Sequence, residues 1–236
     1  MAYRGSMQAL LFDVGGTLIE SRPSPAAVYS EVLSRRGPPA TAEQVAPAFQ
    51  QVWAEMTQAH PRGLDRYHQL KGGETQWWGE FVRRVLALIG HPAPWQPVLD
   101  ELMAAFADPV LWHVFPEVPE VLSSLRGRGL RLAAVSNWDS HLPELLERLG
   151  LLWYFDATLI SALEGIEKPN ITMFRRAAQR LGVPVASCLF VGDSPLDDVR
   201  GAESAGMRAV LVDRAGAFKD GYVRINDLRG IYDFIA

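Results

Sequence analysis

From Pro116 onward, short apolar segments alternate with helical segments, and this alternation limits the possible folds more than any other feature of the chain. Strands separated by helices require crossover connections, which are right-handed and place parallel strands in one sheet. The predicted strands are Leu130–Ser136, Ala157–Ile160, Ser187–Gly192 and Arg208–Val212. The predicted helices are Pro119–Arg128, His141–Gly150, Asn170–Gly182 and Pro195–Ala205. The pattern predicts an α/β fold, a Rossmann-like parallel sheet with helices on both faces.

The part of the chain before Pro116 predicts one more strand and then a helical insertion. The apolar run Gln8–Val14 indicates a buried strand of the same sheet. Helical patterns then follow, separated by proline and glycine, at Ala26–Arg35, Ala42–Gln58, Gly73–Ile89 and Val98–Phe106. We therefore expect a core domain of residues 7–20 and 109–236 and an inserted all-α helical-bundle domain of residues 21–108. Residues 1–6, which precede Met7, are expected to be a cloning-derived tail.

The overall composition excludes several classes of protein. The formal net charge of −4 argues against nucleic acid or an anionic membrane as the main partner. With Cys188 as its one cysteine, the chain has neither an internal disulfide framework nor a thiolate metal cluster. No apolar run reaches the roughly 18 residues of a spanning helix. We expect a cytoplasmic protein, a monomer or homodimer, whose partner is a small molecule.

Polar residues follow the predicted strands at the points where ligands bind in such sheets, the carboxyl ends. They are Asp13 after the first strand, Ser136 and Asn137 after the second, and Asp193 and Asp198 after the fourth, with Lys168 in a loop before a helix. Each has an ordinary structural alternative: a strand end for Asp13, a helix cap for Ser136-Asn137, a solvated ion pair for Lys168, and turn formation for the two later aspartates. Their convergence on one edge favours a site.

The residue types predict phosphoryl chemistry at this edge. Asp13 beside Gly15, Gly16 and Thr17 is a carboxylate next to backbone N–H groups that can hold an anion, and it is therefore the candidate nucleophile. Ser136 and Asn137 are candidate phosphate binders, together with Gly16, Thr17 and Lys168. Lys168 would also offset the charge that develops during transfer.

A hard, oxygen-liganded cation is expected beside the nucleophile, and Mg²⁺ fits best. Asp13, Asp193 and the carbonyl of Gly15 are its candidate ligands. Asp198 would act on the metal through a water or would position Lys168.

Four ordered segments carry a family resemblance: DVGGTL at residues 13–18, VSNWD at 135–139, EKPNITMF at 167–174 and FVGDSPLDDVRGAESAGM at 190–207. Together they resemble the motifs of the haloacid-dehalogenase-like (HAD) superfamily, and the insertion resembles its helical C1-type cap. The resemblance implies a Rossmann-like core, Mg²⁺, an aspartyl-phosphate intermediate and a phosphomonoester substrate. It also implies that Asp13 is the nucleophile, Ser136 the phosphate binder, Lys168 the charge-balancing lysine, and Asp193 with Asp198 the metal acids.

Gly15 departs from the motif of the phosphatases in the family that the chain resembles. They carry a second aspartate at this position, which protonates the leaving group and then activates water, help worth about 10²–10⁴-fold. The chain could act on a substrate whose leaving group has a low pKa. It could also use a surrogate acid, for which the candidates by residue type alone are Glu20, His60, His68 and Glu74. It could also bind phosphate with little turnover.

The preferred function is therefore a Mg²⁺-dependent hydrolase of a small phosphorylated metabolite, with an aspartyl-phosphate intermediate and atypical acid–base machinery. A phosphate-binding sensor and, less favoured, a 2-haloacid dehalogenase are the alternatives. The tryptophans of the insertion, such as Trp53, Trp77 and Trp78, are expected to form its core rather than a stacking site for substrate.

Overall fold

The computed structural model describes residues 7–68, 70–218 and 221–235, so the predicted tail at residues 1–6 lies outside the described residues. Contacts divide the chain into two compact units. One unit contains the chain up to Glu20 and from Val114 onward, and the other is Ser21–His113. In the described part of the chain, no helix combines the length and the apolar character needed to cross a bilayer.

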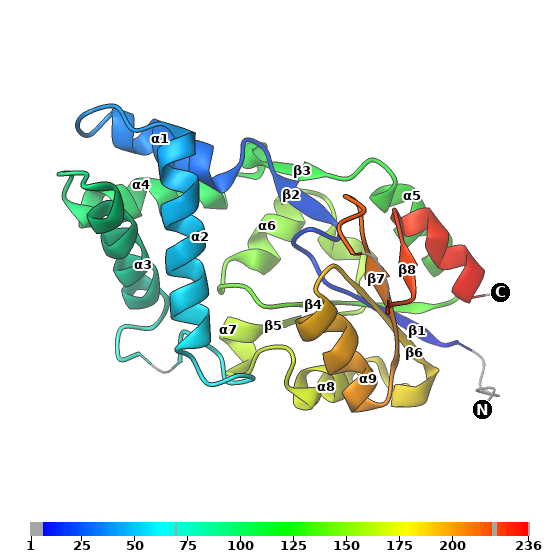
Figure 1. Ribbon diagram of the computed structural model, residues 1–236. Helices are drawn as coiled ribbons and strands as arrows, with labels where there is room; N and C mark the ends of the chain where they lie inside the picture. Colours follow the sequence, from blue (N-terminus) through cyan, green and yellow to red (C-terminus); the bar gives the residue numbers. More distant parts are fainter. Residues whose placement is uncertain (1–6, 69, 219–220, 236) are drawn as a thin grey trace. The chain divides into compact units, whose positions relative to one another are not determined.

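The first unit contains a six-stranded sheet in the order β5-β4-β1-β6-β7-β8 (Figure 1). Its strands are β1 (Ala9–Phe12), β4 (Arg131–Ser136), β5 (Ala157–Ile160), β6 (Cys188–Gly192), β7 (Arg208–Val212) and β8 (Arg224–Ile225). Every neighbouring pair is parallel. The predicted parallel α/β fold class is confirmed.

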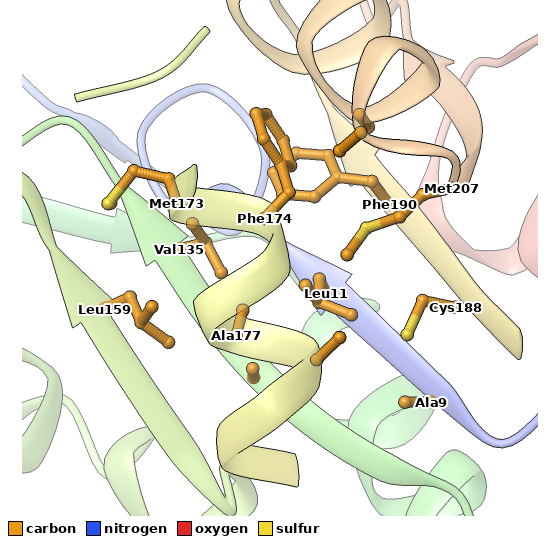
Figure 2. Close-up of a cluster of buried hydrophobic side chains, with 14 of the residues drawn as sticks. Ala9, Leu11, Val135, Leu159, Met173, Phe174, Ala177, Cys188, Phe190 and Met207 are labelled. Atoms are coloured by element: carbon orange, nitrogen blue, oxygen red, sulfur yellow. The ribbon is translucent and has the colours of Figure 1, made fainter. Parts of the chain in front are cut away.

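Helices cover both faces of this sheet (Figure 1). They are α5 (Val118–Gly127), α6 (Leu142–Arg148), α7 (Ser161–Glu164), α8 (Ile171–Leu181) and α9 (Gly201–Ala205). Figure 2 shows how α8 packs on the strands: Phe174 and Ala177 lie over Leu11 of β1, in a fully buried cluster. All four residues of β1 are buried, as expected for a strand with helices on both sides.

The strand order reverses between β1 and β6. The chain leaves β1 toward β4 on one side, and it leaves β6 toward β7 on the other. Loops that diverge in this way leave a crevice at the carboxyl ends of the two strands, where ligands bind in open parallel sheets. Asp13 directly follows β1 and Asp193 directly follows β6, so the fold brings both to this crevice.

The second unit is a bundle of four helices, α1 (Pro25–Ser34), α2 (Ala42–Gln58), α3 (Gly73–Ile89) and α4 (Trp95–Ala107). Each helix packs on the next, and α1 packs on α4. Phe81 and Trp77 are buried at the centre and stack with their ring centroids 5.8 Å apart, which confirms them as core residues. Trp53 touches the same cluster but is 37% exposed. Where the chain passes between the units, β2 (Ile19–Ser21) and β3 (Trp112–Val114) pair with each other.

The structure corrects one predicted element and adds three strands. The helix predicted over Pro195–Ala205 is two elements, a π-helical turn η4 (Pro195–Arg200) followed by α9. The strands β2, β3 and β8 were not predicted, because two or three residues carry too little periodicity to be recognised.

Phe174 should be a major contributor to the stability of the first unit. It is fully buried and meets Phe190 edge-on at 5.0 Å, and no space is left for a side chain at the neighbouring Gly201. Phe174→Ala is expected to lower the free energy of unfolding by about 3–5 kcal/mol, measured by chemical denaturation. Trp153→Ala, which removes a ring that is 63% exposed, should cost less than about 1 kcal/mol. Equal losses for the two variants would contradict this packing.

Candidate active site

The turn after β1 fixes the position of Asp13. The Asp13 N–H donates to the Val191 carbonyl of β6 at 2.9 Å, so the residue is held between the two central strands. The N–H groups of Leu18 and Ile19 donate to the Val14 carbonyl, which closes the turn. The Gly15 carbonyl, a candidate metal ligand, takes none of these bonds.

Gly16 allows the turn to approach the other side of the crevice. Its φ is +73°, a left-handed conformation that side chains disfavour, and a Cβ at this position would overlap the Asp193 carboxylate. The Gly16 N–H donates to the Ile19 carbonyl at 2.8 Å. Gly16 therefore contributes to the site by lacking a side chain, and its predicted contact with phosphate stays a prediction.

One oxygen of the Asp13 carboxylate is held by two donors. Lys168 Nζ donates to Asp13 Oδ1 at 2.6 Å, and the Ser136 hydroxyl donates to the same atom at 3.0 Å. All three side chains are buried. The carboxylate is thus oriented through Oδ1, and its second oxygen is the one available for another partner.

Asn137 positions Lys168. Its side-chain Nδ2 donates to the Lys168 carbonyl at 2.9 Å, while its Oδ1 accepts the Lys168 N–H at 2.7 Å. This two-bond pairing occupies both ends of the amide. Asn137 holds the backbone of Lys168 at the edge of the sheet. Its predicted contact with phosphate stays a prediction.

The π-helical turn η4 aims Asp198 at Lys168. The Val199 N–H donates to the Ser194 carbonyl, an i→i+5 bond that widens the turn. Asp198 Oδ2 accepts the Ser194 N–H at 2.9 Å, and Oδ1 accepts Lys168 Nζ at 2.6 Å. A side chain at Gly192 would collide with this carboxylate, so glycine is needed there. Asp198 thus contacts Lys168, as one of its two predicted roles requires, and its role at the metal stays a prediction.

Three carboxylates converge in this crevice. Ligand oxygens of Asp13, Asp193 and Asp198 all lie within 4.8 Å of one another. Burial, and next the charge of Asp13, raise the pKa of Asp193 to about 7. Burial also raises the pKa of Asp198 to about 6, although Lys168 opposes this. The negative charge of the cluster is therefore only partly balanced, which is the condition that favours binding of a divalent cation.

Lys168 supplies the positive charge that partly compensates the three carboxylates of the cluster. Burial opposes its charge, but Asp13 and Asp198 outweigh burial and raise the pKa of its ammonium group above the ordinary value. The lysine is therefore charged at neutral pH. Its ammonium group also lies 5.3 Å from the ring centre of Phe190, in the buried core beneath the site.

Arg214 was missed by the sequence reasoning. It donates to the Thr17 carbonyl and to the Glu117 carboxylate, both at 2.7 Å, and its guanidinium lies over the Phe115 ring. It ties the end of β7 to the turn that follows Asp13. The signal was available, because Arg214 follows the last long strand at the same edge of the sheet. Thr17 itself is fully buried, and its hydroxyl has no hydrogen-bond partner among the described residues.

Trp138 was also missed as a site residue. It follows Ser136-Asn137 at the end of β4, and the six-membered part of its indole would lie 3.1 Å from a Cβ built on Gly15. The place toward which a side chain at position 15 would extend is therefore bounded by an aromatic ring. The aromatic residue after the Ser-Asn pair was the available signal.

Comparison with known proteins decides the family. A sequence model of haloacid dehalogenase-like hydrolases matches residues 7–206. The chain belongs to the haloacid dehalogenase-like hydrolase family. It is therefore a hydrolase, as predicted, and the resemblance drawn from the four motifs is confirmed.

Relatives within this family include named phosphatases. Haloacid dehalogenase-like hydrolase domain-containing protein 3 of Mus musculus is 36% identical over 90% of this chain and 84% of its own length. The phosphoserine phosphatase of Thermus thermophilus is 32% identical over 96% of this chain and 98% of its own length. The solved structure of the HAD-hydrolase YfnB from Bacillus subtilis bound to magnesium superposes with a TM-score of 0.80, covering 98% of this chain and 99% of that one, at 18% identity. The last comparison supports the fold alone.

The four predicted surrogate acids are divided between the two units. His60 contacts the Leu64 carbonyl at 2.6 Å, and His68 contacts the buried Asp65 at 2.8 Å, both within the helical unit. Glu74 lies in the same unit and Glu20 at the end of the other. A role as acid for any of the four stays a prediction.

Asp193→Asn should separate metal binding from folding. The pKa of an aspartate in an unfolded chain is about 3.9, whereas the pKa of Asp193 in the folded protein is about 7. Between these two values the folded, metal-free protein binds one proton more than the unfolded chain. Its free energy of unfolding therefore falls as pH rises through this range. Relative to wild type, Asp193→Asn in chelator should gain thermal stability between pH 5 and pH 8, yet lose the increase in Tm that Mg²⁺ gives.

Asp197→Asn is the matched control, because it removes the same charge four residues further along the chain and lies outside the carboxylate cluster. It should keep the Mg²⁺-dependent increase. A Tm difference between Asp193→Asn and wild type that is independent of pH would contradict the electrostatic account.

Proposed function

We propose that this hydrolase is a Mg²⁺-dependent phosphatase that acts on a small phosphorylated metabolite through an aspartyl-phosphate at Asp13. The observation that carries the proposal is the arrangement around the Asp13 carboxylate. One oxygen is held by Lys168 and Ser136, and the other is left to attack. Phosphatase relatives, including the Thermus thermophilus phosphoserine phosphatase, support the same reaction class.

In the first step, the second oxygen of Asp13 forms a bond to phosphorus while the bond from phosphorus to the leaving oxygen breaks. The leaving group departs with the electron pair. Lys168 offsets the charge of the carboxylate and the phosphoryl group, and Ser136 keeps the carboxylate oriented for attack. In the second step water attacks the aspartyl-phosphate, which releases phosphate and frees Asp13.

The described residues fit a magnesium ion. Asp13, Asp193 and the Gly15 carbonyl are the ligands we assign, and Asp198 supports them through Lys168. Their oxygen atoms are the hard donors that Mg²⁺ prefers, and one or two carboxylates leave room for substrate oxygens and water. The ion would supply charge neutralisation at the phosphoryl oxygens.

Gly15 limits the leaving groups that the site can expel. Glycine has no side chain that could protonate the departing oxygen, so a leaving group that is stable as an anion is favoured. Acyl phosphates and aryl phosphates meet this condition, whereas alkyl and sugar phosphates do not. The same lack of a base slows the attack of water on the aspartyl-phosphate, and this step should limit turnover.

We further propose that the four-helix unit serves as the C1-type cap that controls access of substrate and water. The expected setting remains the cytoplasm. It is consistent with the one cysteine, Cys188, being buried in the core of the sheet. Monomer and homodimer remain the two proposed assemblies.

The order of substrate preference tests the proposed chemistry. With Mg²⁺, the protein is expected to hydrolyse 4-nitrophenyl phosphate and acetyl phosphate with a higher kcat/KM than a sugar phosphate. Asp13→Asn should reduce kcat on the order of 10³-fold or more, and Asp197→Asn should not. An equal or higher kcat/KM for the sugar phosphate would contradict the requirement for a good leaving group. Binding of a phosphate mimic without turnover of any ester would instead favour the sensor.

Removal of the metal distinguishes phosphoryl transfer from dehalogenation. Chelator is expected to abolish release of phosphate, and readdition of Mg²⁺ should restore it. Halide release from a 2-haloacid should be absent both with and without chelator. Halide release that persists in chelator would overturn the proposal in favour of the dehalogenase alternative.

A further inference from the structure

An aromatic ring lies close to the place that a side chain at position 15 would occupy. Its backbone is not in the left-handed region, unlike that of Gly16, so the conformation itself would accept another residue. The three heavy atoms nearest to an added Cβ all belong to Trp138: Cζ3 would lie at 3.1 Å, and Cε3 and Cη2 at 3.9 Å. The indole would have to shift by a few tenths of an ångström to accept even a Cβ.

Position 15 lies in the same part of the fold as Asp13. Gly15 comes two residues after Asp13 in the turn that follows β1. Trp138 comes two residues after Ser136, whose hydroxyl donates to Asp13 Oδ1 at 3.0 Å. The ring that bounds position 15 therefore belongs to a segment that also contacts the candidate nucleophile.

The backbone of Trp138 is held firmly in this place. Its N–H donates to the Ser161 hydroxyl at 3.1 Å, and the same hydroxyl lies 3.1 Å from the Trp138 carbonyl. That carbonyl also accepts the Ala162 N–H at 3.2 Å. Ser161 is fully buried, so these bonds are shielded from water. Trp138 as a whole is partly buried.

We infer that Trp138 forms the leaving-group subsite and selects flat aromatic leaving groups, so that the preferred substrates are aryl phosphates. The inference rests on the proposed phosphatase function and narrows it. An indole offers a broad apolar face on which another aromatic ring can stack, and it offers no acid to a departing oxygen. An aryl group satisfies both conditions, because it stacks and because a phenolate of low pKa leaves without a proton.

In the selected reaction, Asp13 forms the oxygen–phosphorus bond as the aryl oxygen–phosphorus bond breaks. The electron pair goes to the aryl oxygen, and the phenolate takes its proton from solvent after it leaves. No other co-reactant is needed besides the water of the second step.

Two substrates of low leaving-group pKa separate the roles of Trp138 and Gly15. 4-Nitrophenyl phosphate is aromatic, whereas acetyl phosphate is small and cannot stack. The measured quantity is the selectivity, the ratio of kcat/KM for the aryl phosphate to that for acetyl phosphate, with Mg²⁺. Trp138→Ala is expected to lower this ratio about 2- to 12-fold, mainly through KM for the aryl phosphate. Trp138→Phe should keep most of it.

Trp153→Ala is the matched control, because Trp153 is an exposed tryptophan of the same unit. It should leave the selectivity unchanged. An unchanged selectivity in folded Trp138→Ala, or an equal loss in Trp153→Ala, would overturn the inference. Failure of the proposed function is a separate result, in which the wild-type protein hydrolyses neither substrate.

A double substitution tests the steric part of the inference. Gly15→Asp alone should gain little activity on an alkyl phosphate, because the indole obstructs the new carboxyl group. Gly15→Asp combined with Trp138→Ala should be faster than Gly15→Asp by about 10²-fold, the lower end of general acid–base help. A gain in Gly15→Asp alone that equals the gain in the double variant would show that Trp138 does not occupy the place of the acid.

Discussion

The site depends on one buried ammonium group. Lys168 lies between Asp13 and Asp198 at 2.6 Å from each, and these three side chains are buried, whereas the nearby Asp193 is partly exposed. Buried carboxylates at such separations repel one another strongly, and the free energy of unfolding falls sharply when one partner of a buried pair is lost. Asn137 binds the backbone of Lys168 and the turn η4 aims Asp198, so two separate segments serve to keep that lysine in place. Asp13 is held in place because its counterion, Lys168, is held in place.

The parallel sheet makes this arrangement possible. Asp13 and Asp193 leave adjacent strands at the point where the strand order reverses, and close approach is permitted by Gly16, which has no side chain to meet the Asp193 carboxylate. The opposite charge is brought in by Lys168, 155 residues from Asp13 along the chain. The core beneath, with Phe174 and Phe190 in edge-on contact, provides a rigid base for residues whose positions must be accurate to fractions of an ångström.

The sequence predicted what depends on periodicity and on strand ends. Long helices such as α2 and α3 and the strands β5 and β7 were predicted with their observed bounds, because their apolar patterns are long or sharply bounded. The candidate site residues were predicted by the rule that ligands meet the carboxyl ends of parallel strands, and the fold brings Asp13, Asp193 and Asp198 together there. Contacts across space were not predictable. The pairing of Asn137 with the Lys168 backbone, the anchoring of the Thr17 carbonyl by Arg214, and the ring of Trp138 against Gly15 join segments that no local pattern relates. The π-helical turn was missed because its sequence also satisfies an α-helix.

The central claim is that Asp13 becomes phosphorylated and that Gly15, lacking a base, lets this intermediate accumulate. The most direct measurement is rapid acid quenching of the Mg²⁺-loaded protein during turnover of 4-nitrophenyl phosphate, followed by mass spectrometry of the peptide that contains Asp13. The account predicts a phosphorylated Asp13 in a substantial fraction of the molecules, with none in Asp13→Asn or in chelator. Turnover without any phosphorylation of this peptide would contradict it.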